Sequence, residues 1–166
     1  GRELAVRTRY EVILTVKDNK YETSDSRLTF ETGLMGEPIE GEFISHNFSN
    51  CVPEFRKVFS AKKNVKRARL FATALGVYEI FLNGTRVGDL YDAPGWTSYT
   101  HRLQYQAYDV TGLLVNNNEI RALVAPGWYA GVLGYFHQKN CYGERTAFCM
   151  TLYIEYKDGK KEVVKT

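Results

Sequence analysis

The sequence predicts an all-β protein built as an antiparallel β-sandwich. Aromatic residues make up 14% of its 166 residues, and tyrosine, phenylalanine and tryptophan are enriched in strands. Short segments that alternate apolar and polar side chains follow one another along the chain, with turn residues between them. No helical segment separates two strands with the spacing of a βαβ unit, so a parallel sheet is not expected.

Two alternating segments open the chain. Residues 10–16 ("YEVILTV") place apolar side chains against a more polar face, and residues 27–32 ("RLTFET") continue this pattern after a turn at residues 17–20. An isolated two-stranded hairpin is marginally stable in water. We therefore expect this piece to dock on the sandwich and cover four of its side chains, Val12, Leu14, Leu28 and Phe30.

The remaining strands are predicted from the same alternation. Their segments are residues 54–61, 67–75, 77–89, 119–125 and 147–165. Asn83-Gly84 marks a hairpin turn, because a type I′ turn needs a positive φ at both central positions, and a second hairpin is expected to turn at Asp158-Gly159. Side chains predicted to face the core are Ala68, Leu70, Ala72, Ala74, Ile120, Ala122, Val124, Phe148, Met150, Leu152 and Ile154. Many short strands joined by turns predict a jelly roll.

Helical signals are confined to residues 109–119 ("DVTGLLVNNNE"). Asp109 is a capping residue type, and Leu113 and Leu114 follow it at a spacing that suits one face of a helix. We expect one or two helical turns here, followed by an asparagine-rich loop.

Charge and hydropathy argue against nucleic acid and membranes as partners. The net charge of +3 is small, and the basic cluster at residues 62–69 lacks the interleaved aromatic residues of a nucleic-acid site. This cluster is typical of a solvated loop that enters a strand. No segment approaches the ~20 apolar residues of a membrane span.

The cysteines give a weak indication of the compartment. Cys51, Cys141 and Cys149 are odd in number and widely spaced, so they are interpreted as free thiols rather than as a disulfide framework. Free thiols favour the cytoplasm over secretion. Because Gly1 is not an initiator methionine, we take the chain as part of a longer protein, and the missing signal peptide says nothing about export.

A search for catalytic motifs finds none. The chain has no GxSxG, phosphate-binding loop, GxGxxG or HExxH pattern. His137 and Cys141 are four residues apart, but one such pair without further ligands does not predict a metal site. A glycosidase needs two carboxylates that face each other, yet nearly all the acidic residues lie at turns or on polar strand faces. No catalytic or metal-binding residue is predicted.

The four residues APGW occur twice, at 93–96 and 125–128. Proline fixes φ and glycine permits a positive φ, so each copy is expected to end a strand and turn the chain at a sheet rim. We predict that Trp96 and Trp128 cap opposite ends of the core, with Trp96 the more buried and Trp128 the more exposed.

The alternative is that the rim aromatics stack on a sugar ring, which we favour less than packing. Arg102 would join them because a guanidinium can donate to vicinal hydroxyls. The candidate carbohydrate-binding residues are Trp96, Tyr99, Arg102, Trp128, Tyr129 and Tyr135.

An ordered series of motifs runs from residue 68 to residue 135. An Ala-Arg-Leu strand and an "ALG-Y" corner are followed by "NG-RVGD", "APGWT-Y", "R-QY", "YDVT" and "GWY-G-LG". This series resembles the N-terminal β-sandwich domain of bacterial α-L-rhamnosidases, glycoside hydrolase family 78, over roughly residues 28–160. Two departures are the second APGW, where the family usually has Gly-Asp-Gly-Trp, and residues 42–44 (Glu-Phe-Ile), where a Trp-Ile pair is common.

The resemblance implies a galactose-binding-like jelly roll and a division of the chain. Residues 30–34 ("FETGL") match the close of an upstream fibronectin-like domain in this family. Residues 1–34 are accordingly expected to be the last strands of a truncated fibronectin-like domain, and residues 35–166 the rhamnosidase N-terminal jelly roll.

The resemblance also implies a function. The parent enzyme hydrolyses terminal α-L-rhamnose with inversion, and its two carboxylates lie on a separate (α/α)6 barrel that this chain lacks. This chain is therefore expected to be a non-catalytic domain that packs on that barrel and needs no cofactor.

Two alternatives remain from the sequence. One is a carbohydrate-binding module for rhamnose-containing glycans. Related modules hold rhamnose through calcium with an Asp-Asn pair near the NG hairpin, but Leu82-Asn83 stands there, so calcium is not favoured. The other is a jelly-roll domain of another glycosidase, such as a β-galactosidase or β-glucuronidase. Residues 93–111 argue against it, because those enzymes have a shorter, glycine-rich connection at this point.

Overall fold

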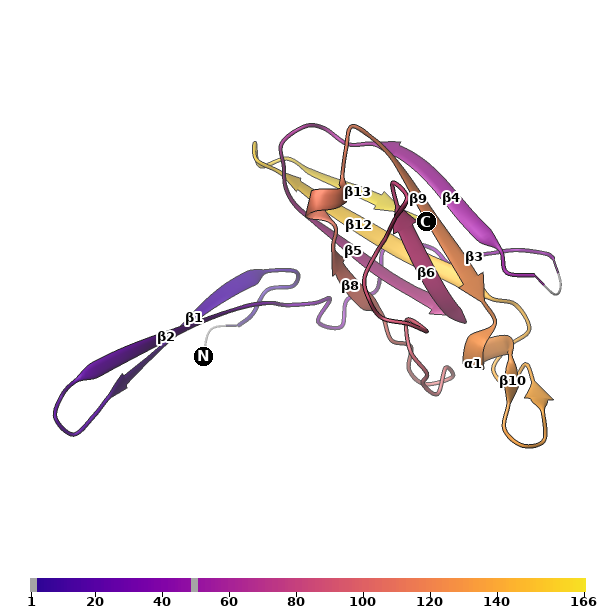
Figure 1. The fold of residues 1–166 in the computed structure, drawn as a ribbon, viewed down its shortest axis with the longest axis horizontal. Coiled ribbons are helices and arrows are strands. Elements are labelled where there is room, and N and C mark those ends of the chain that lie inside the picture. The colour runs from indigo at the N-terminus through magenta and orange to yellow at the C-terminus, as the bar shows by residue number, and fades with distance from the viewer. Residues whose placement is uncertain (1–2, 49–50) are drawn as a thin grey trace. The chain divides into compact units, whose positions relative to one another are not determined.

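The computed structural model describes residues 3–48 and 51–166. The chain separates into two compact units, Gly1–Pro38 and Ile39–Thr166 (Figure 1). Assignment of the first unit to a fibronectin-like domain stays a prediction.

The first unit is a hairpin of strands β1 (Arg9–Lys17) and β2 (Thr23–Glu31). The strands pair antiparallel from Arg9↔Glu31 to Lys17↔Thr23. Both strands were predicted, but β2 begins earlier than residue 27. The turn explains this, because the Asp18 Oδ1 accepts hydrogen bonds from the backbone N–H groups of Lys20 (2.8 Å) and Glu22 (2.9 Å) and brings the chain back at once.

Docking of this hairpin on the sandwich stays a prediction that hydrogen exchange tests. Val12, Leu14 and Leu28 are exposed within the hairpin unit. A docked hairpin opens less often than a free one, so the amides of β1 and β2 are expected to exchange slowly in the monomer. Amides of the buried sandwich strands serve as the protected reference. Unprotected amides throughout both hairpin strands, in a monomer, would refute docking.

The second unit is a sandwich of two sheets (Figure 1). The strands of the first sheet are β3 (Ile44–Ser45), β5 (Val65–Leu75), β8 (Gln106–Asp109), β12 (Ala147–Tyr156) and β13 (Lys161–Lys165). The strands of the second sheet are β4 (Glu54–Ser60), β6 (Val77–Leu82), β7 (Thr85–Arg86) and β9 (Asn117–Ala125). Their orders are β13-β12-β5-β8, with β3 also on β12, and β4-β9-β6-β7. All these pairings are antiparallel, which confirms the predicted antiparallel β-sandwich.

The core lies between the two sheets and contains the side chains that the alternation placed there. All the side chains that were predicted to face the core have at most 3% of their surface exposed: Ala68, Leu70, Ala72, Ala74, Ile120, Ala122, Val124, Phe148, Met150, Leu152 and Ile154. Tyr78 and Tyr156 bring hydroxyl groups into the core, and Tyr78 lies between the two sheets. The Tyr78 hydroxyl donates to the Ala72 carbonyl (3.2 Å) and lies 3.1 Å from the Tyr108 hydroxyl. Burial raises the pKa of Tyr78 well above its ordinary value.

The outer face of the first sheet is also buried, which the alternation did not predict. Phe71 and Thr151 point away from the core but are almost fully buried. Loops cover them: the Gly41 N–H donates to Thr151 Oγ1 (2.9 Å) and the Phe71 ring packs on Tyr105 at 5.9 Å. The sequence pattern predicted the strands correctly, but it could not show that loops from elsewhere would cover their second face.

Both predicted hairpin turns are present. Asn83 and Gly84 have φ values of 53° and 80°, and Gly159 has φ 83°. The Asn83 side chain fixes the first turn further, because its amide donates to the Leu113 carbonyl (2.8 Å) and its Oδ1 accepts from the Glu119 N–H (2.9 Å).

The helical prediction is confirmed at its lower limit of one turn, but the expected asparagine-rich loop was wrong, because β9 begins at Asn117. Only a single 3-10 turn, η1 (Thr111–Leu113), forms, and the Asp109 Oδ1 accepts a hydrogen bond from the Thr111 N–H at 3.0 Å. Asn118, expected in a loop, is buried in β9, where its Oδ1 accepts from the Val115 N–H (2.9 Å). The helical turn therefore ends before Asn117 and Asn118, which belong to strand β9. Among the described residues, no helix is both long enough and apolar enough to cross a bilayer.

Ion pairs between the neighbouring strands β5 and β12 predict a pH dependence. The hydrogen bond from Lys66 lowers the pKa of Glu155, and the charges of Lys66, Arg67 and Lys161 lower it further against the opposing effect of burial. A carboxyl with a lowered folded-state pKa stabilises the fold above its unfolded pKa of about 4.3 and loses this contribution as pH falls through the folded pKa.

The free energy of unfolding is therefore expected to fall on acidification below about pH 4, and less steeply in Glu155→Gln. Denaturant titrations between neutral pH and pH 3 measure both slopes. An identical slope in Glu155→Gln would contradict the prediction.

Candidate functional site

The two APGW segments lie at one end of the sandwich, on opposite edges of the same strand. Ala125 is the last residue of β9 and pairs with Val77 at the start of β6. Ala93 forms a bridge with the next residue, Tyr78, from the other edge of β6. Since β6 lies between them, the residues that follow both segments meet at its end. The second copy ends a strand as predicted, whereas the first makes only this single bridge.

The two glycines turn the chain toward each other after these pairings. Gly95 has φ 110° and Gly127 has φ 50°, values that an L side chain rarely adopts. A Cβ at Gly127 would lie 2.6 Å from Val77 Cγ1, so the second segment also needs glycine for space. Gly127 begins the short helix α1 (Gly127–Ala130), which the sequence analysis did not predict.

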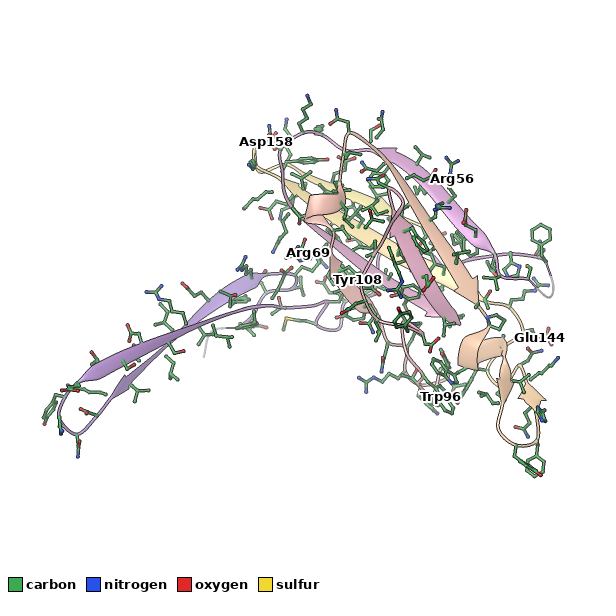
Figure 2. All side chains as sticks on the ribbon, in the orientation of Figure 1. Arg56, Arg69, Trp96, Tyr108, Glu144 and Asp158 are labelled. Carbon is green, nitrogen blue, oxygen red and sulfur yellow. The ribbon has the colours of Figure 1, made fainter. Side chains whose placement is uncertain are left out.

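Trp96 and Trp128 stack on each other. Their ring centroids are 6.0 Å apart and their planes differ by 1°, an offset parallel arrangement. The prediction that they cap opposite ends of the core was wrong. Their relative burial was also predicted wrongly, because Trp96 is 54% exposed and Trp128 is the less exposed of the two. Trp128 is held by α1 at the end of β9, whereas Trp96 lies outside it on a loop (Figure 2).

Three tyrosines from the same segments and the loop at residues 140–143 pack on one another. The Tyr99 ring contacts Tyr129 of α1 at 5.3 Å and Tyr142 at 5.0 Å between centroids. A Cβ at Gly143 would overlap the Tyr129 hydroxyl, so glycine permits this close approach. The cluster joins α1 to the loops at residues 97–105 and 140–143.

The Tyr99 hydroxyl is enclosed by this cluster. Among residues 3–48 and 51–166 it is buried without a hydrogen-bond partner. Burial raises the pKa of Tyr99, and the neighbouring Tyr142 raises it further. Tyr99 can therefore support the neighbouring aromatic rings, but its hydroxyl does not reach a ligand in this arrangement.

The structure brings together four of the six candidate sugar-binding residues, as the stacked Trp96–Trp128 pair and the Tyr99–Tyr129 pair. Arg102 is exposed, and its carbonyl accepts a hydrogen bond from Thr97 Oγ1. Tyr135 is 91% exposed and packs on Phe136. This pair lies at the tip of a hairpin of β10 (Val132–Leu133) and β11 (Gln138–Lys139). Carbohydrate binding by these six residues stays a prediction.

A groove of about 850 Å³ adjoins the same end of the sandwich, and the sequence analysis missed it. Its described lining residues come from three parts of the chain, residues 46–48 with 51–52, residues 126–132 and residues 139–146. We call it the His46 groove. The His46 ring is held by its Nε2, 3.2 Å from Thr146 Oγ1, and its Nδ1 lies 4.0 Å from Cys51 Sγ. Its segments are too distant in sequence for any local pattern to unite them.

No metal centre is assigned. Within residues 3–48 and 51–166, no group of three or more His, Cys, Asp and Glu side chains could hold an ion. At the NG hairpin the Asn83 Oδ1 is already bonded to the Glu119 N–H, so it is not available as a calcium ligand. His137 and Cys141 lie on a surface loop, where the Cys141 thiol contacts the Gln138 carbonyl at 3.9 Å.

Comparison with known proteins identifies the family of this sandwich. The family model described as the α-L-rhamnosidase N-terminal domain matches residues 63–166. The chain belongs to the α-L-rhamnosidase N-terminal domain family. The match favours an α-L-rhamnosidase over the other glycosidases considered from the sequence.

Relatives of this α-L-rhamnosidase N-terminal domain are much longer. An α-L-rhamnosidase of Streptomyces avermitilis is 56% identical over 103 residues, which are 60% of this chain and 10% of that protein. An α-L-rhamnosidase of Formosa agariphila is 33% identical over 159 residues, 87% of this chain and 17% of that protein.

Solved structures agree with this assignment. The α-L-rhamnosidase from Aspergillus terreus matches with a TM-score of 0.82 and 31% identity over 99% of this chain and 20% of that one. The S. avermitilis α-L-rhamnosidase, solved with L-rhamnose, matches with a TM-score of 0.66 and 49% identity over 68% of this chain and 11% of that one. The chain thus spans between a tenth and a fifth of the length of these relatives.

Proposed function

We propose that this chain is the non-catalytic N-terminal domain of an inverting α-L-rhamnosidase, and that its sandwich packs on the catalytic (α/α)6 barrel of that parent protein. The observation that carries the proposal is the family match over residues 63–166. The α-L-rhamnosidases that this chain resembles are much longer, and the chain spans only 10–20% of their length. The parent is proposed to hydrolyse terminal α-L-rhamnose.

The placement of carboxylates supports a non-catalytic role. Inversion needs an acid and a base carboxyl about 6.5–9.5 Å apart around a water, with the pKa of the acid raised. Burial acts to raise the pKa of Asp109, but hydrogen bonds from Thr111 and the charge of Arg69 outweigh it and lower the pKa. Glu79 pairs with Arg86 at 3.2 Å and Glu54 with Arg121 at 3.4 Å. These carboxylates form ion pairs with arginines of the two sheets, and we assign none of them to catalysis.

The exposed aromatic end supports packing against another domain. Trp96 presents 54% of its surface, and Tyr135 and Phe136 present 91% and 84%. Exposed large aromatics are typical of interfaces, where they contribute more binding energy than other residues. Because the relatives are much longer than this chain, we propose that this end packs against a further domain of the same protein, the catalytic barrel.

A comparison between this chain and its full-length parent tests the packing. Trp96→Ala is expected to lower the melting temperature of the parent more than that of this chain, because the exposed indole face becomes buried against the barrel. Val58→Ala, an exposed apolar residue on β4, serves as the control and is expected to have similarly small effects in both. Equal losses from Trp96→Ala in the two proteins would contradict packing at this end.

A further inference from the structure

The His46 groove has the size of a ligand site. Its volume of about 850 Å³ lies within the range of about 300–1,000 Å³ that small-molecule sites occupy. One wall is α1 with Pro126 and Ala130, and the facing walls carry His46 and Glu144. In Figure 2 Glu144 lies near α1 at this end of the sandwich.

Several polar side chains of the groove retain unused hydrogen-bonding capacity. Within the part of the chain that the structure describes, Glu144, Lys139 and Asn140 form no hydrogen bond or ion pair through their side chains. Arg145 makes one long hydrogen bond, 3.3 Å from its guanidinium to Asn47 Oδ1. Carboxylate, amide, ammonium and guanidinium groups together can both accept and donate, which suits the hydroxyls of a polyol.

An aromatic surface borders these polar groups. Phe48 is 76% exposed although it lines the groove, and its ring stacks on His46 at 6.4 Å with planes 17° apart. Thr146 Oγ1 lies 3.2 Å from the His46 Nε2 and holds the ring at this position. The CH groups of a pyranose form an apolar face that can cover such a ring and remove it from water.

The charge of the groove argues for a neutral ligand. Lys139 and Arg145 are opposed by Glu144, which leaves an excess of a single positive charge among these three residues. A polyanion would require several cations and no carboxylate. A neutral saccharide needs the mixed donors and acceptors that are present.

We propose that the His46 groove binds a neutral oligosaccharide that carries α-L-rhamnose, with Glu144 accepting and Arg145 and Lys139 donating hydrogen bonds to its hydroxyls. The saccharide class rests on the groove itself, whereas the choice of rhamnose rests on the proposed function. The groove would hold a glycan chain of the parent enzyme's substrate and does not depend on Trp96.

Calorimetric titration of this chain with an α-linked L-rhamnose disaccharide tests the proposal. Glu144→Ala and Arg145→Ala are each expected to weaken binding about tenfold or more, since each removes a charged hydrogen-bond partner. Glu144 has no partner in the described protein, so its loss should leave the melting temperature unchanged. Trp96→Ala is the matched control and should leave the affinity unchanged.

The cysteines supply a second readout in the unmodified protein. Cys51 and Cys141 are both exposed, and only Cys51 lines the groove. Saturating disaccharide is expected to slow alkylation of Cys51 by iodoacetamide and to leave the rate at Cys141 unchanged. Buried Cys149 should stay unmodified in the folded protein.

The outcomes separate the possible sites. Absence of binding, equal alkylation of Cys51 with and without sugar, or loss of binding only in Trp96→Ala would each overturn the proposal. Failure of the proposed function is recognised separately, because hydrolysis of a rhamnoside by this chain would refute it without changing where the disaccharide binds.

Discussion

Phe148→Ala is expected to lower the free energy of unfolding of the sandwich by about 3–5 kcal/mol, as the loss of a large buried aromatic does. Phe148 is 2% exposed and lies on β12, where it pairs with Ala74 of β5 and Ile44 of β3. Its ring meets Tyr78 edge-on at 5.6 Å and stacks with Phe55 at 6.5 Å, so its removal leaves a cavity between the two sheets.

Phe136→Ala is the matched control for this substitution. Phe136 is 84% exposed at the tip of the β10–β11 hairpin, and its replacement is expected to change stability by no more than about 0.5 kcal/mol. Urea titrations of the three proteins measure both differences. Similar losses from Phe148→Ala and Phe136→Ala would show that the core between the sheets has been placed wrongly.

Trp128→Ala is expected to cost about 2–3 kcal/mol, less than a fully buried tryptophan would but more than Trp96→Ala. Trp128 lies on α1, next to the pairing of Ala125 with Val77, and is the less exposed of the stacked pair. Trp96 loses mainly the stacking contact, which is worth about 0.5–1.5 kcal/mol.

Thermal and urea unfolding of the two variants, with the double variant added, separate these contributions. The double variant should cost less than the sum of the single ones, because both remove the same stacking contact. A greater loss from Trp96→Ala than from Trp128→Ala, or strict additivity, would contradict the stacked geometry.

The strands and the core could be predicted from the sequence because they depend on local alternation. Leu70, Met150 and Ile154 are buried where period-two alternation placed them, and Asn83-Gly84 forms its hairpin because positive φ is a property of the residues themselves. β8 was not predicted. Its four residues, Gln106–Asp109, are too few for a pattern, and they form a strand because β5 offers a free edge.

The candidate site was harder to predict because it depends on tertiary contacts. The repeat of APGW was recognisable, but the stacking of Trp96 on Trp128 follows from both segments pairing with the start of β6. The burial of Phe71 likewise depends on Tyr105 from a distant loop. In the His46 groove, residues from three separate segments converge, and nothing in the local sequence marks any of them as a ligand-binding residue.

Hydrolysis of an aryl α-L-rhamnoside by this chain alone tests the central claim most directly. The claim is the proposal that this domain is non-catalytic, with Asp109, Glu79 and Glu54 in ion pairs and Glu144 in a binding groove rather than in an acid–base pair. Incubation with the purified chain is predicted to release no phenol above the rate in buffer. Robust turnover that a single carboxylate substitution abolishes, Glu144→Gln being the first to examine because Glu144 lines the His46 groove, would contradict it.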